Sequence, residues 1–398
     1  MTDAPKQTGT PPTGAGRNPL QALREAGQSI WLDYIHRGML RSGEFARLVA
    51  DGVSGVTSNP TIFEKAITGS TDYDDALDAL VAQGQSAEEI YETLITEDIR
   101  AAADTLRPVF DNTGGADGYV SVEVSPLLAH DTTSTIQEVR RWFAQIDRPN
   151  LKVKIPATRE GIPAIEQMIA EGRNINITLI FSLEMYREVI EAYLRGLERR
   201  VADGQPVDRI ASVASFFVSR IDTEADRRLE ARAQAARDPT EAERIRALRG
   251  TVAIANAKLA YEMFREVFGS ARFRALAARG ARVQRPLWAS TSTKNPAYPD
   301  LLYVESLVGP DTINTLPPHT LEALRDHGRI TPGTVMQDLD GARRVFARLA
   351  EIGISMDDVT QTVLDNGVKL FSDSFEQLFR SIEERRQAVI GAASAKAT

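Results

Sequence analysis

The feature that most constrains the fold is an alternation of polar and apolar residues with a period of two. It occurs in three successive segments, which are YVSVEVS (119–125), NLKVKIP (150–156) and NINITLI (174–180). Because successive side chains of a strand point to opposite faces, each segment predicts a strand with one apolar face and one polar face. Such strands fit either an open sheet with one face in water or a closed barrel with a polar lining.

The arrangement of the other segments decides between these alternatives. Amphipathic stretches with apolar residues at helical spacing separate eight short β-rich segments, which are 30–35, 55–58, 119–124, 150–155, 174–180, 211–218, 285–290 and 311–316. Parallel sheets built from such units are normally covered on both faces, so the polar faces must line a barrel. We therefore predict an α/β fold, a (β/α)₈ TIM barrel with additional helices and a C-terminal helical extension.

The chain is expected to form one domain over residues 20–398. The Pro-, Gly- and Thr-rich segment 1–19 is expected to be a disordered tail. Two connections, 61–118 and 222–282, are longer than a barrel needs. The second contains a heavily charged stretch, 224–250, which predicts a solvated helical hairpin outside the barrel.

The segment after the last predicted strand is expected to be helical and to pack across the barrel. Its Phe371, Phe375 and Phe379 recur at i, i+4 and i+8. This spacing favours a stripe of core residues over a binding groove.

Composition excludes several classes of protein. The absence of cysteine removes disulfides and thiolate chemistry, and it suits a reducing compartment such as the cytoplasm. The four histidines are scattered, so neither a metal site nor any cofactor is expected. No apolar run reaches the roughly 20 residues of a membrane span, and the N-terminus lacks the hydrophobic stretch of a secretion signal. The net charge of −8 argues against nucleic acid and means that a local cationic pocket must hold any anionic substrate.

The polar lining combines a carboxylate, Glu123, with two amines, Lys152 and Lys154. A lysine near other cations or in apolar surroundings loses its proton more easily, and the neutral amine can attack a carbonyl group. Lys154 lies nearer the C-terminal end of its strand and is the better candidate nucleophile. Lys152, one layer deeper, is expected to pair with a carboxylate or to lower the pKa of Lys154 by repulsion. The alternative is a buried Lys–Glu ion pair without chemistry.

Six segments resemble, in order, the strand-end motifs of the transaldolase family, in particular its longer bacterial branch within the class I Schiff-base aldolases. They are GVTSNPTIFEKAI (55–67), VSVEVSPLLAHDT (120–132), LKVKIPAT (151–158), NINITLIFS (174–182), ASFFVSRID (214–222) and WASTSTKN (288–295). Six motifs in family order, each at a predicted strand end, form a specific signal.

The resemblance implies four catalytic residues. Lys154 matches the lysine that forms the Schiff base, and Glu123 matches a carboxylate that works through a bound water. Thr178 matches the residue that positions this water, and Asp33 matches the aspartate that exchanges a proton with the C4 hydroxyl of the substrate.

The resemblance also implies a set of substrate-binding residues, which are Thr57, Asn59, Asn176, Ser215, Phe217, Arg220, Ser290 and Lys294. Asn59 and Asn176 match amides that hold sugar hydroxyls, and Ser290 and Arg220 match phosphate-binding positions. Better-known members have a short Ser-x-Arg at the seventh strand, whereas this chain has STSTKN (290–295), so Lys294 is expected to replace the second phosphate cation. The alternative for at least two of the hydroxyls at 290–293 is a loop that caps a helix.

The function implied is transfer of a dihydroxyacetone unit from sedoheptulose 7-phosphate or fructose 6-phosphate. The acceptor is glyceraldehyde 3-phosphate or erythrose 4-phosphate, in the non-oxidative pentose phosphate pathway. A fructose-6-phosphate aldolase, a sugar-phosphate isomerase and a non-catalytic sugar-phosphate-binding barrel are the alternatives. Related aldolases have a tyrosine where this chain has Phe217 and lack the carboxylate at Glu123, and both differences favour transfer.

Overall fold

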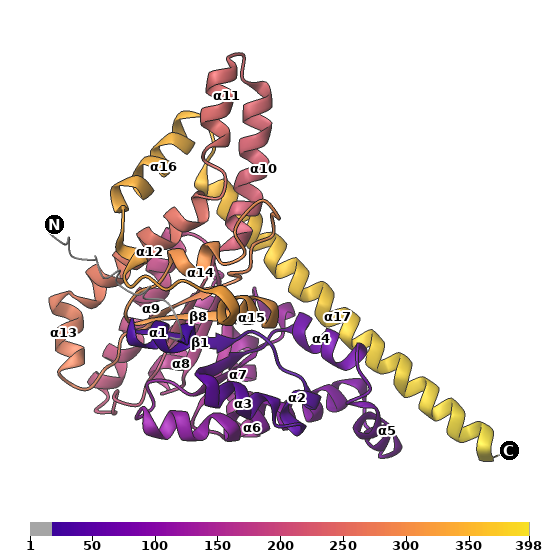
Figure 1. The fold of residues 1–398 in the computed structure, drawn as a ribbon. Helices are drawn as coiled ribbons and strands as arrows, with labels where there is room; N and C mark the ends of the chain where they lie inside the picture. The colour runs from indigo at the N-terminus through magenta and orange to yellow at the C-terminus, as the bar shows by residue number, and fades with distance from the viewer. Residues whose placement is uncertain (1–17, 398) are drawn as a thin grey trace, which may run out of the picture.

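The computed structural model describes residues 18–397 and shows a closed barrel of eight parallel strands in the order β1 to β8 (Figure 1). The strands are β1 (Gln28–Leu32), β2 (Val53–Thr57), β3 (Tyr119–Glu123), β4 (Leu151–Pro156), β5 (Ile175–Ile180), β6 (Val213–Phe217), β7 (Arg285–Ala289) and β8 (Thr312–Leu316). β8 pairs with β1 in parallel and closes the barrel. The predicted (β/α)₈ fold is confirmed, and each predicted strand overlaps an observed one.

Helices surround the barrel and cover its C-terminal face. They are α1 (Pro19–Glu25), α2 (Arg37–Arg41), α3 (Glu44–Asp51), α4 (Pro60–Thr68), α5 (Asp74–Ala82), α6 (Ala87–Asn112), α7 (Thr132–Ile146), α8 (Gly161–Ala170), α9 (Leu183–Ala202), α10 (Ser219–Ala235), α11 (Pro239–Arg246), α12 (Val252–Phe268), α13 (Ala271–Ala277), α14 (Leu302–Ser306), α15 (Pro318–His327), α16 (Leu339–Glu351) and α17 (Met356–Ala397). Two 3₁₀ turns, η1 (Pro126–Leu128) and η2 (Thr334–Met336), complete the described elements. None of the described helices combines the length and apolarity needed to cross a bilayer.

The start of α1 can be compared with the predicted domain boundary at residue 20. Most of the predicted tail, 1–19, lies outside the described residues. Asn18 caps α1 through its side chain, which accepts a hydrogen bond from the backbone N–H of Leu20. Regular structure therefore begins close to the expected start of the domain.

The first strand ends earlier than predicted. β1 covers Gln28–Leu32 instead of 30–35, so Asp33 follows the strand directly. The backbone N–H of Asp33 still donates to the carbonyl of Leu316 on β8 at 2.7 Å. Asp33 is thereby fixed at the C-terminal mouth of the barrel, where TIM barrels place their chemistry.

The predicted alternation of faces holds on the strands that carry the lysines. Glu123 of β3 lies in register with Lys154 of β4, and Lys154 lies in register with Asn176 of β5. Between them, Val153 and Ile155 are fully buried on the opposite, apolar face. The polar inner face and the apolar outer face thus follow from the period of two.

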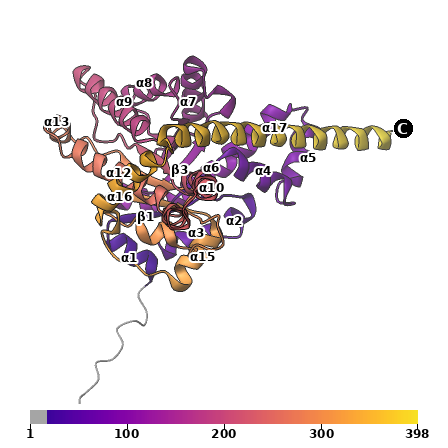
Figure 2. The same ribbon diagram turned by 90° about the horizontal axis from the view of Figure 1, so that it is seen from above.

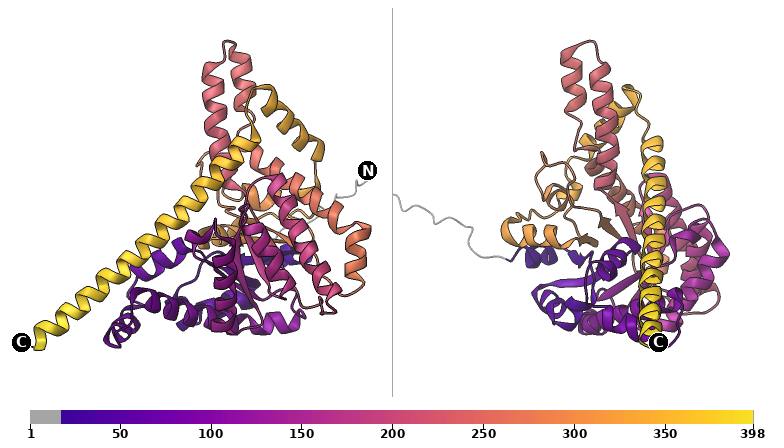
Figure 3. Two further views of the ribbon diagram at one scale, coloured as in Figure 1. Left: turned by 180° about the vertical axis from the view of Figure 1, so that it is seen from behind. Right: turned by 90° about the vertical axis from the view of Figure 1, so that its right-hand side faces the viewer.

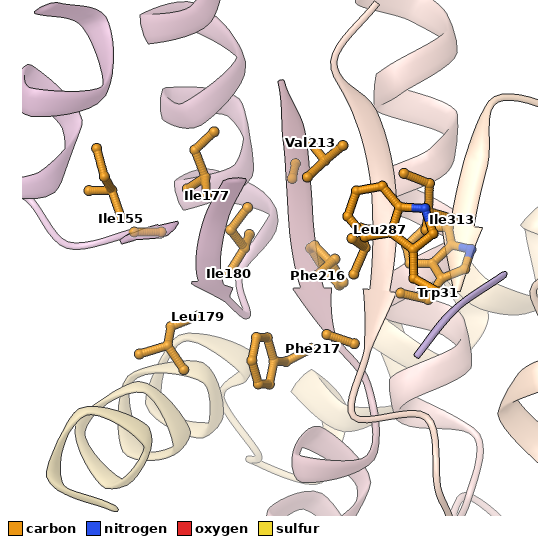
Figure 4. Close-up of a cluster of buried hydrophobic side chains, with 14 of the residues drawn as sticks. Trp31, Ile155, Ile177, Leu179, Ile180, Val213, Phe216, Phe217, Leu287 and Ile313 are labelled. Atoms are coloured by element: carbon orange, nitrogen blue, oxygen red, sulfur yellow. The ribbon is translucent and has the colours of Figure 1, made fainter. Parts of the chain in front are cut away.

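Leu179 is the exception to this alternation. The pairing of β5 with β6 shifts between Ile177 and Ile180, and Leu179 adopts a φ of 58°. Its side chain lies apart from Ile177 and close to α17, where a methyl group at Gly367 would approach it to 3.2 Å (Figure 4). Our prediction that Leu179 packs outward was therefore wrong, because the strand bulges before it ends.

The C-terminal helix α17 packs across the barrel, as predicted. It runs past α10 and α4 and ends beyond the body of the molecule (Figures 1, 2 and 3). Phe371 is buried, with 3% of its surface exposed, in agreement with a core stripe. Phe375 and Phe379 are only partly buried and pack against Tyr91 with ring centroids 5.6 and 5.1 Å away.

The charged stretch 224–250 forms a helical hairpin, as predicted. Only α10 and α11 project from the barrel as a helical pair (Figure 1). Glu230 of α10 holds the pair together through Arg246 and Arg249, each at 3.2 Å. The rest of the connection 222–282, from α12 onward, carries many buried apolar residues and belongs to the helical layer of the barrel.

Candidate active site

A cavity of about 510 Å³ opens at the C-terminal ends of the strands. It is lined by ten of the predicted site residues: Asp33, Thr57, Asn59, Lys154, Thr178, Ser215, Phe217, Arg220, Ser290 and Lys294. Glu123 and Asn176 do not line it but lie behind its wall, within the same barrel interior. Residues from six strands and their following loops therefore meet in one place, as the barrel topology requires.

Three lysines of the described chain line the cavity, and of these only Lys154 lies on a strand of the barrel. Its Nζ lies 2.7 Å from Oε2 of Glu123 and donates to the carbonyl of Ser58 at 2.9 Å. Both partners of the ion pair are about 5% exposed at the side chain. Burial raises the pKa of Glu123, while the charge of Lys154 opposes this shift. The Glu123 carboxylate therefore lies within direct proton-transfer distance of the Lys154 amine.

Asp33 follows β1 at the same mouth, with β2 between its strand and the strand of Glu123. Its Oδ1 accepts a hydrogen bond from Oγ1 of Thr57 at 2.7 Å, and the Thr57 oxygen is also 2.7 Å from Oγ1 of Thr315. Burial raises the pKa of Asp33, and the charge of Lys154 and the bond from Thr57 oppose that rise. The two carboxylates thus lie at the ends of separate strands, β1 and β3, with different partners, which lets them hold different protonation states.

Thr178 has a free hydroxyl in the wall of the cavity. Its Oγ1 is buried and makes no hydrogen bond to another described residue. A buried hydroxyl without a partner is uncommon in proteins. This hydroxyl is consequently available to donate a hydrogen bond to a small molecule in the cavity, or to accept one from it.

The two predicted amides differ in availability. Asn59 caps α4 with its Oδ1, which accepts from the backbone N–H of Ile62 at 2.9 Å, so its NH₂ group remains available at the cavity. Asn176 is fully buried; it donates to Oγ of Ser121 at 3.1 Å and accepts from Oγ of Ser215 at 2.7 Å. One N–H of its amide and one lone pair of its Oδ1 are not used by these two bonds.

Cations gather on one side of the cavity, around β6 and β7. Arg220 begins α10, and its guanidinium lies 5.4 Å from the ring centroid of Phe217 without a hydrogen bond to any described residue. Lys294 donates to Oγ of Ser292 at 2.7 Å. Partial burial of the Lys294 ammonium and the nearby charge of Arg220 lower its pKa. The oxygen of Ser290 lies 2.9 Å from that of Ser219.

The alternative for the hydroxyls at 290–293 was a loop that caps a helix, and this is wrong. The next helix, α14, begins at Leu302 and has no side-chain cap. Ser290 and Ser292 line the cavity, whereas Thr291 is fully buried and donates to Oδ1 of Asn314 at 2.8 Å. The loop is held to the barrel at Thr291 and exposes hydroxyls to the cavity on either side.

One of the two roles expected for Lys152, pairing with a carboxylate, is not observed in the part of the chain that the structure describes. Lys152 donates to the carbonyl of Ala211 at 2.6 Å and lies 3.7 Å from the ring centroid of Tyr119. It forms no ion pair with a carboxylate of the described chain, so the expected pairing is wrong. Burial lowers the pKa of Lys152 well below its usual value.

Lys65, His319 and Phe371 are among the residues of the cavity wall that sequence reasoning missed. The sequence signal for Lys65 is its spacing: it follows Thr61 by four residues, which places both on one face of α4. In the structure both residues line the cavity. Phe371 was assigned to the core; its ring is buried but lies 6.0 Å from Nζ of Lys154. Within residues 18–397, no group of three or more acidic or histidine side chains is arranged to bind a metal ion.

Comparison with known proteins agrees with this geometry. The profile of the transaldolase/fructose-6-phosphate aldolase family matches residues 30–382. The chain is 51% identical to a transaldolase of Thermobifida fusca (strain YX) over 93% of its own length and 99% of the relative. It is 49% identical to a transaldolase of Saccharopolyspora erythraea, over 92% and 97% of the two chains, and 48% identical to transaldolase 2 of Nostoc punctiforme, with the same coverage.

Proposed function

The chain belongs to the transaldolase/fructose-6-phosphate aldolase family, and we propose that its transaldolase reaction proceeds through a Schiff base on Lys154. The enzyme moves a dihydroxyacetone unit from sedoheptulose 7-phosphate or fructose 6-phosphate to glyceraldehyde 3-phosphate or erythrose 4-phosphate. The observation that carries the assignment is the buried Lys154–Glu123 pair at 2.7 Å, at the bottom of a cavity at the strand ends.

The first half of the reaction forms the Schiff base. Glu123 takes the proton that the Lys154 ammonium must lose, and the neutral amine attacks the C2 carbonyl of the ketose. The resulting carbinolamine loses water and leaves an iminium on Nζ. We assign to Glu123 the proton transfers of these steps, through a water held by the otherwise unpartnered hydroxyl of Thr178.

The second half breaks and remakes a carbon–carbon bond. Asp33 takes the proton of the C4 hydroxyl, the C3–C4 bond breaks, and its electrons move into the iminium to give an enamine. The aldehyde product leaves, an acceptor aldehyde enters, and the same steps run in reverse. Thr57 supports this role because it fixes Asp33 from the neighbouring strand at 2.7 Å.

Transfer requires that the enamine survive until an acceptor arrives. The aromatic rings of Phe217 and Phe371 form an apolar part of the cavity wall near Lys154. Both residues are less than 10% exposed. We propose that they limit access of water that would protonate the enamine. This favours transfer over the release of dihydroxyacetone by an aldolase.

Recognition of the substrate is assigned to the remaining polar groups. Asn59 and Asn176 hold sugar hydroxyls, with Thr57 and Ser215 beside them. Arg220, Ser290 and Lys294 bind the phosphate, and Lys65 adds a further cation at the same cavity. Because the chain carries a net charge of −8, this local group must supply the attraction for anionic substrates. The absence of cysteine supports a cytoplasmic location.

The test is borohydride trapping. The protein is incubated with fructose 6-phosphate without acceptor, reduced, and mapped by mass spectrometry. A reduced three-carbon adduct on Lys154 is the expected result. An adduct on Lys152 would overturn the assignment of the nucleophile, and folded protein without any lysine adduct would overturn the mechanism.

A further inference from the structure

The loop that carries Lys294 contains no regular structure between the end of β7 at Ala289 and the start of α14 at Leu302. Arg220, the other phosphate cation, stands on a different element at the start of α10. Two cations bind one phosphate together most effectively when the distance between them is fixed. Something must therefore hold the loop against α10.

Two carboxylates of α10 make this connection, one to the loop itself and one to α14, which directly follows the loop. Oδ2 of Asp226 accepts a hydrogen bond from the hydroxyl of Tyr298 in the loop at 2.5 Å, and its Oδ1 accepts from the backbone N–H of Gly250 at 3.1 Å. Asp222, one turn earlier, accepts from the hydroxyl of Tyr303 at 2.8 Å. Bonds of this kind, to a charged acceptor, are stronger than neutral ones.

Tyr298 is joined closely to Lys294. The backbone N–H of Tyr298 donates to the carbonyl of Asn295 at 3.0 Å, and Oδ1 of Asn295 accepts from the N–H of Ala297 at 3.0 Å. This compact turn begins at the residue after Lys294. A displacement of Tyr298 is thus transmitted through one tight turn to the lysine.

The surroundings of Tyr298 fit the ring closely. Gly250 lies beneath it with a φ of 72°, and a methyl group there would be 2.9 Å from Cζ of the tyrosine. Only glycine satisfies both the backbone conformation and the space at this position. The ring is therefore seated between the start of α12 and the loop, and its hydroxyl is aimed at Asp226.

We propose that Asp226 and Tyr298 are positioning residues that fix Lys294 relative to Arg220 and thereby set the preference for phosphorylated substrates. This inference rests on the phosphate-binding role proposed for Lys294. Without the bond from Tyr298 to Asp226, the loop has to be ordered each time a phosphate binds, which weakens binding. The chemistry at Lys154 is untouched, because neither residue lines the catalytic cavity.

The experiment compares glyceraldehyde 3-phosphate with unphosphorylated glyceraldehyde as acceptor. Tyr298→Phe keeps the ring and removes only the hydroxyl. We expect KM for the phosphorylated acceptor to rise about fivefold, with kcat little changed, since a bond to a charged group contributes enough for at least this factor. The kcat/KM for glyceraldehyde should stay the same. Asp226→Asn should give the same selective loss.

The matched control is Tyr261→Phe. Tyr261 donates its hydroxyl to the carbonyl of Pro310, at 3.0 Å, just before β8. This variant also loses a tyrosine hydroxyl, but at the opposite end of the barrel. It should therefore change neither KM nor kcat/KM for either acceptor. Thermal unfolding of each variant shows that the comparison is made on folded protein.

Double variants separate this inference from the proposed function. If Lys294→Met lowers the preference for the phosphorylated acceptor and Tyr298→Phe adds nothing to it, the inference is supported. Suppose that Lys294→Met lowers the preference but Tyr298→Phe alone leaves it unchanged, or lowers kcat/KM equally for both acceptors. The positioning role is then wrong and the role of Lys294 stands. If Lys294→Met leaves the preference unchanged, the assignment of Lys294 is wrong and this inference falls with it.

Discussion

Lys152 and Lys154 stand two residues apart on the same inner face of β4, yet the barrel treats them differently. Lys152 is 1% exposed and closed in by the carbonyl of Ala211 and the ring of Tyr119. Lys154 is 4% exposed, pairs with Glu123 and lines the cavity. Burial alone therefore does not distinguish the proposed nucleophile, Lys154, from Lys152.

The difference lies in the neighbours and in access. A carboxylate beside Lys154 can take and return a proton, whereas Lys152 has an uncharged carbonyl and a ring face as partners. Tyr119 begins β3 and Glu123 ends it, so one strand supplies both environments. This matches the usual division of a TIM barrel, in which the C-terminal layer carries function and the deeper layers carry stability.

The largest expected effect separates the two lysines in activity. Lys154→Met should lower kcat/KM by roughly 10⁵-fold and abolish borohydride trapping, because removal of a covalent nucleophile costs this order of rate. Lys152→Met should keep the adduct on Lys154 and change kcat by less than about threefold, a factor of under 1 kcal/mol in barrier height. Coupled assays of transfer and mass spectrometry measure both. A loss of comparable size in Lys152→Met would remove the distinction between the layers.

The second effect concerns the carboxylates of the upper layer. Asp33→Asn and Glu123→Gln should each lower kcat by about 10² to 10⁴-fold, the usual contribution of a positioned acid or base. They should differ in trapping. Glu123→Gln should slow formation of the adduct, whereas Asp33→Asn should still form a Schiff base with the intact six-carbon ketose, because only cleavage needs Asp33. Single-turnover trapping with mass analysis distinguishes a six-carbon from a three-carbon adduct, and identical adduct patterns would contradict the separate roles.

The sequence predicted what depends on periodicity and on the strand-end motifs. The barrel and the inward lysines followed from the period of two, and ten of the predicted residues meet at one cavity. The bulge at Leu179 was not predictable, because its φ of 58° arises from pairing across β5 and β6 and from contact with α17. Phe371 was read correctly as buried, but only tertiary packing shows that it covers Lys154.

Contacts between distant segments explain the other differences. The expected carboxylate partner of Lys152 was inferred from charge alone, whereas the barrel offers it the carbonyl of Ala211 from 59 residues away. Likewise, the hydroxyls at 290–293 suggested a helix cap. In the structure the hydroxyl of Thr291 instead donates a hydrogen bond to Asn314 of β8. Local composition gives the donors and acceptors, and the fold chooses among them.

A third prediction concerns the fate of the enamine in the upper layer. Phe217 is 7% exposed and its ring packs against Phe181 with centroids 5.2 Å apart. Phe217→Tyr brings a hydroxyl to the cavity, which can hold a water for protonation of the enamine. We expect release of dihydroxyacetone from fructose 6-phosphate without acceptor to rise about tenfold, or about 1.4 kcal/mol in barrier. The matched control, Phe216→Tyr, changes a ring on the outer face and should not increase release. Unchanged release in Phe217→Tyr would contradict the water-excluding role of this ring.

The smallest effect tests the lower layer through stability instead of rate. Burial lowers the pKa of Lys152 in the folded protein, with Arg285 and Arg282 adding to the shift and Asp117 opposing it. In the unfolded chain the same lysine titrates near 10.4, about its ordinary value. Between the folded and unfolded pKa values the unfolded state binds one more proton, so this group makes stability increase with pH. Its destabilising contribution is therefore present at neutral pH and disappears as the pH approaches 10.4.

Lys152→Met removes the titrating group and keeps most of the volume, at the cost of leaving the carbonyl of Ala211 without its donor, about 1–3 kcal/mol. The free energy of unfolding of the variant relative to the parent should consequently be most favourable near pH 7. It should fall by up to about 1.4 kcal/mol for each pH unit toward pH 10. Urea unfolding at pH 7, 8 and 9 measures this difference, and Lys369→Met, at a lysine that is exposed and pairs with Asp373, should give parallel profiles. A pH-independent difference for Lys152→Met would mean that Lys152 remains charged inside the barrel. The lower layer would then differ from the upper one only in lacking a carboxylate.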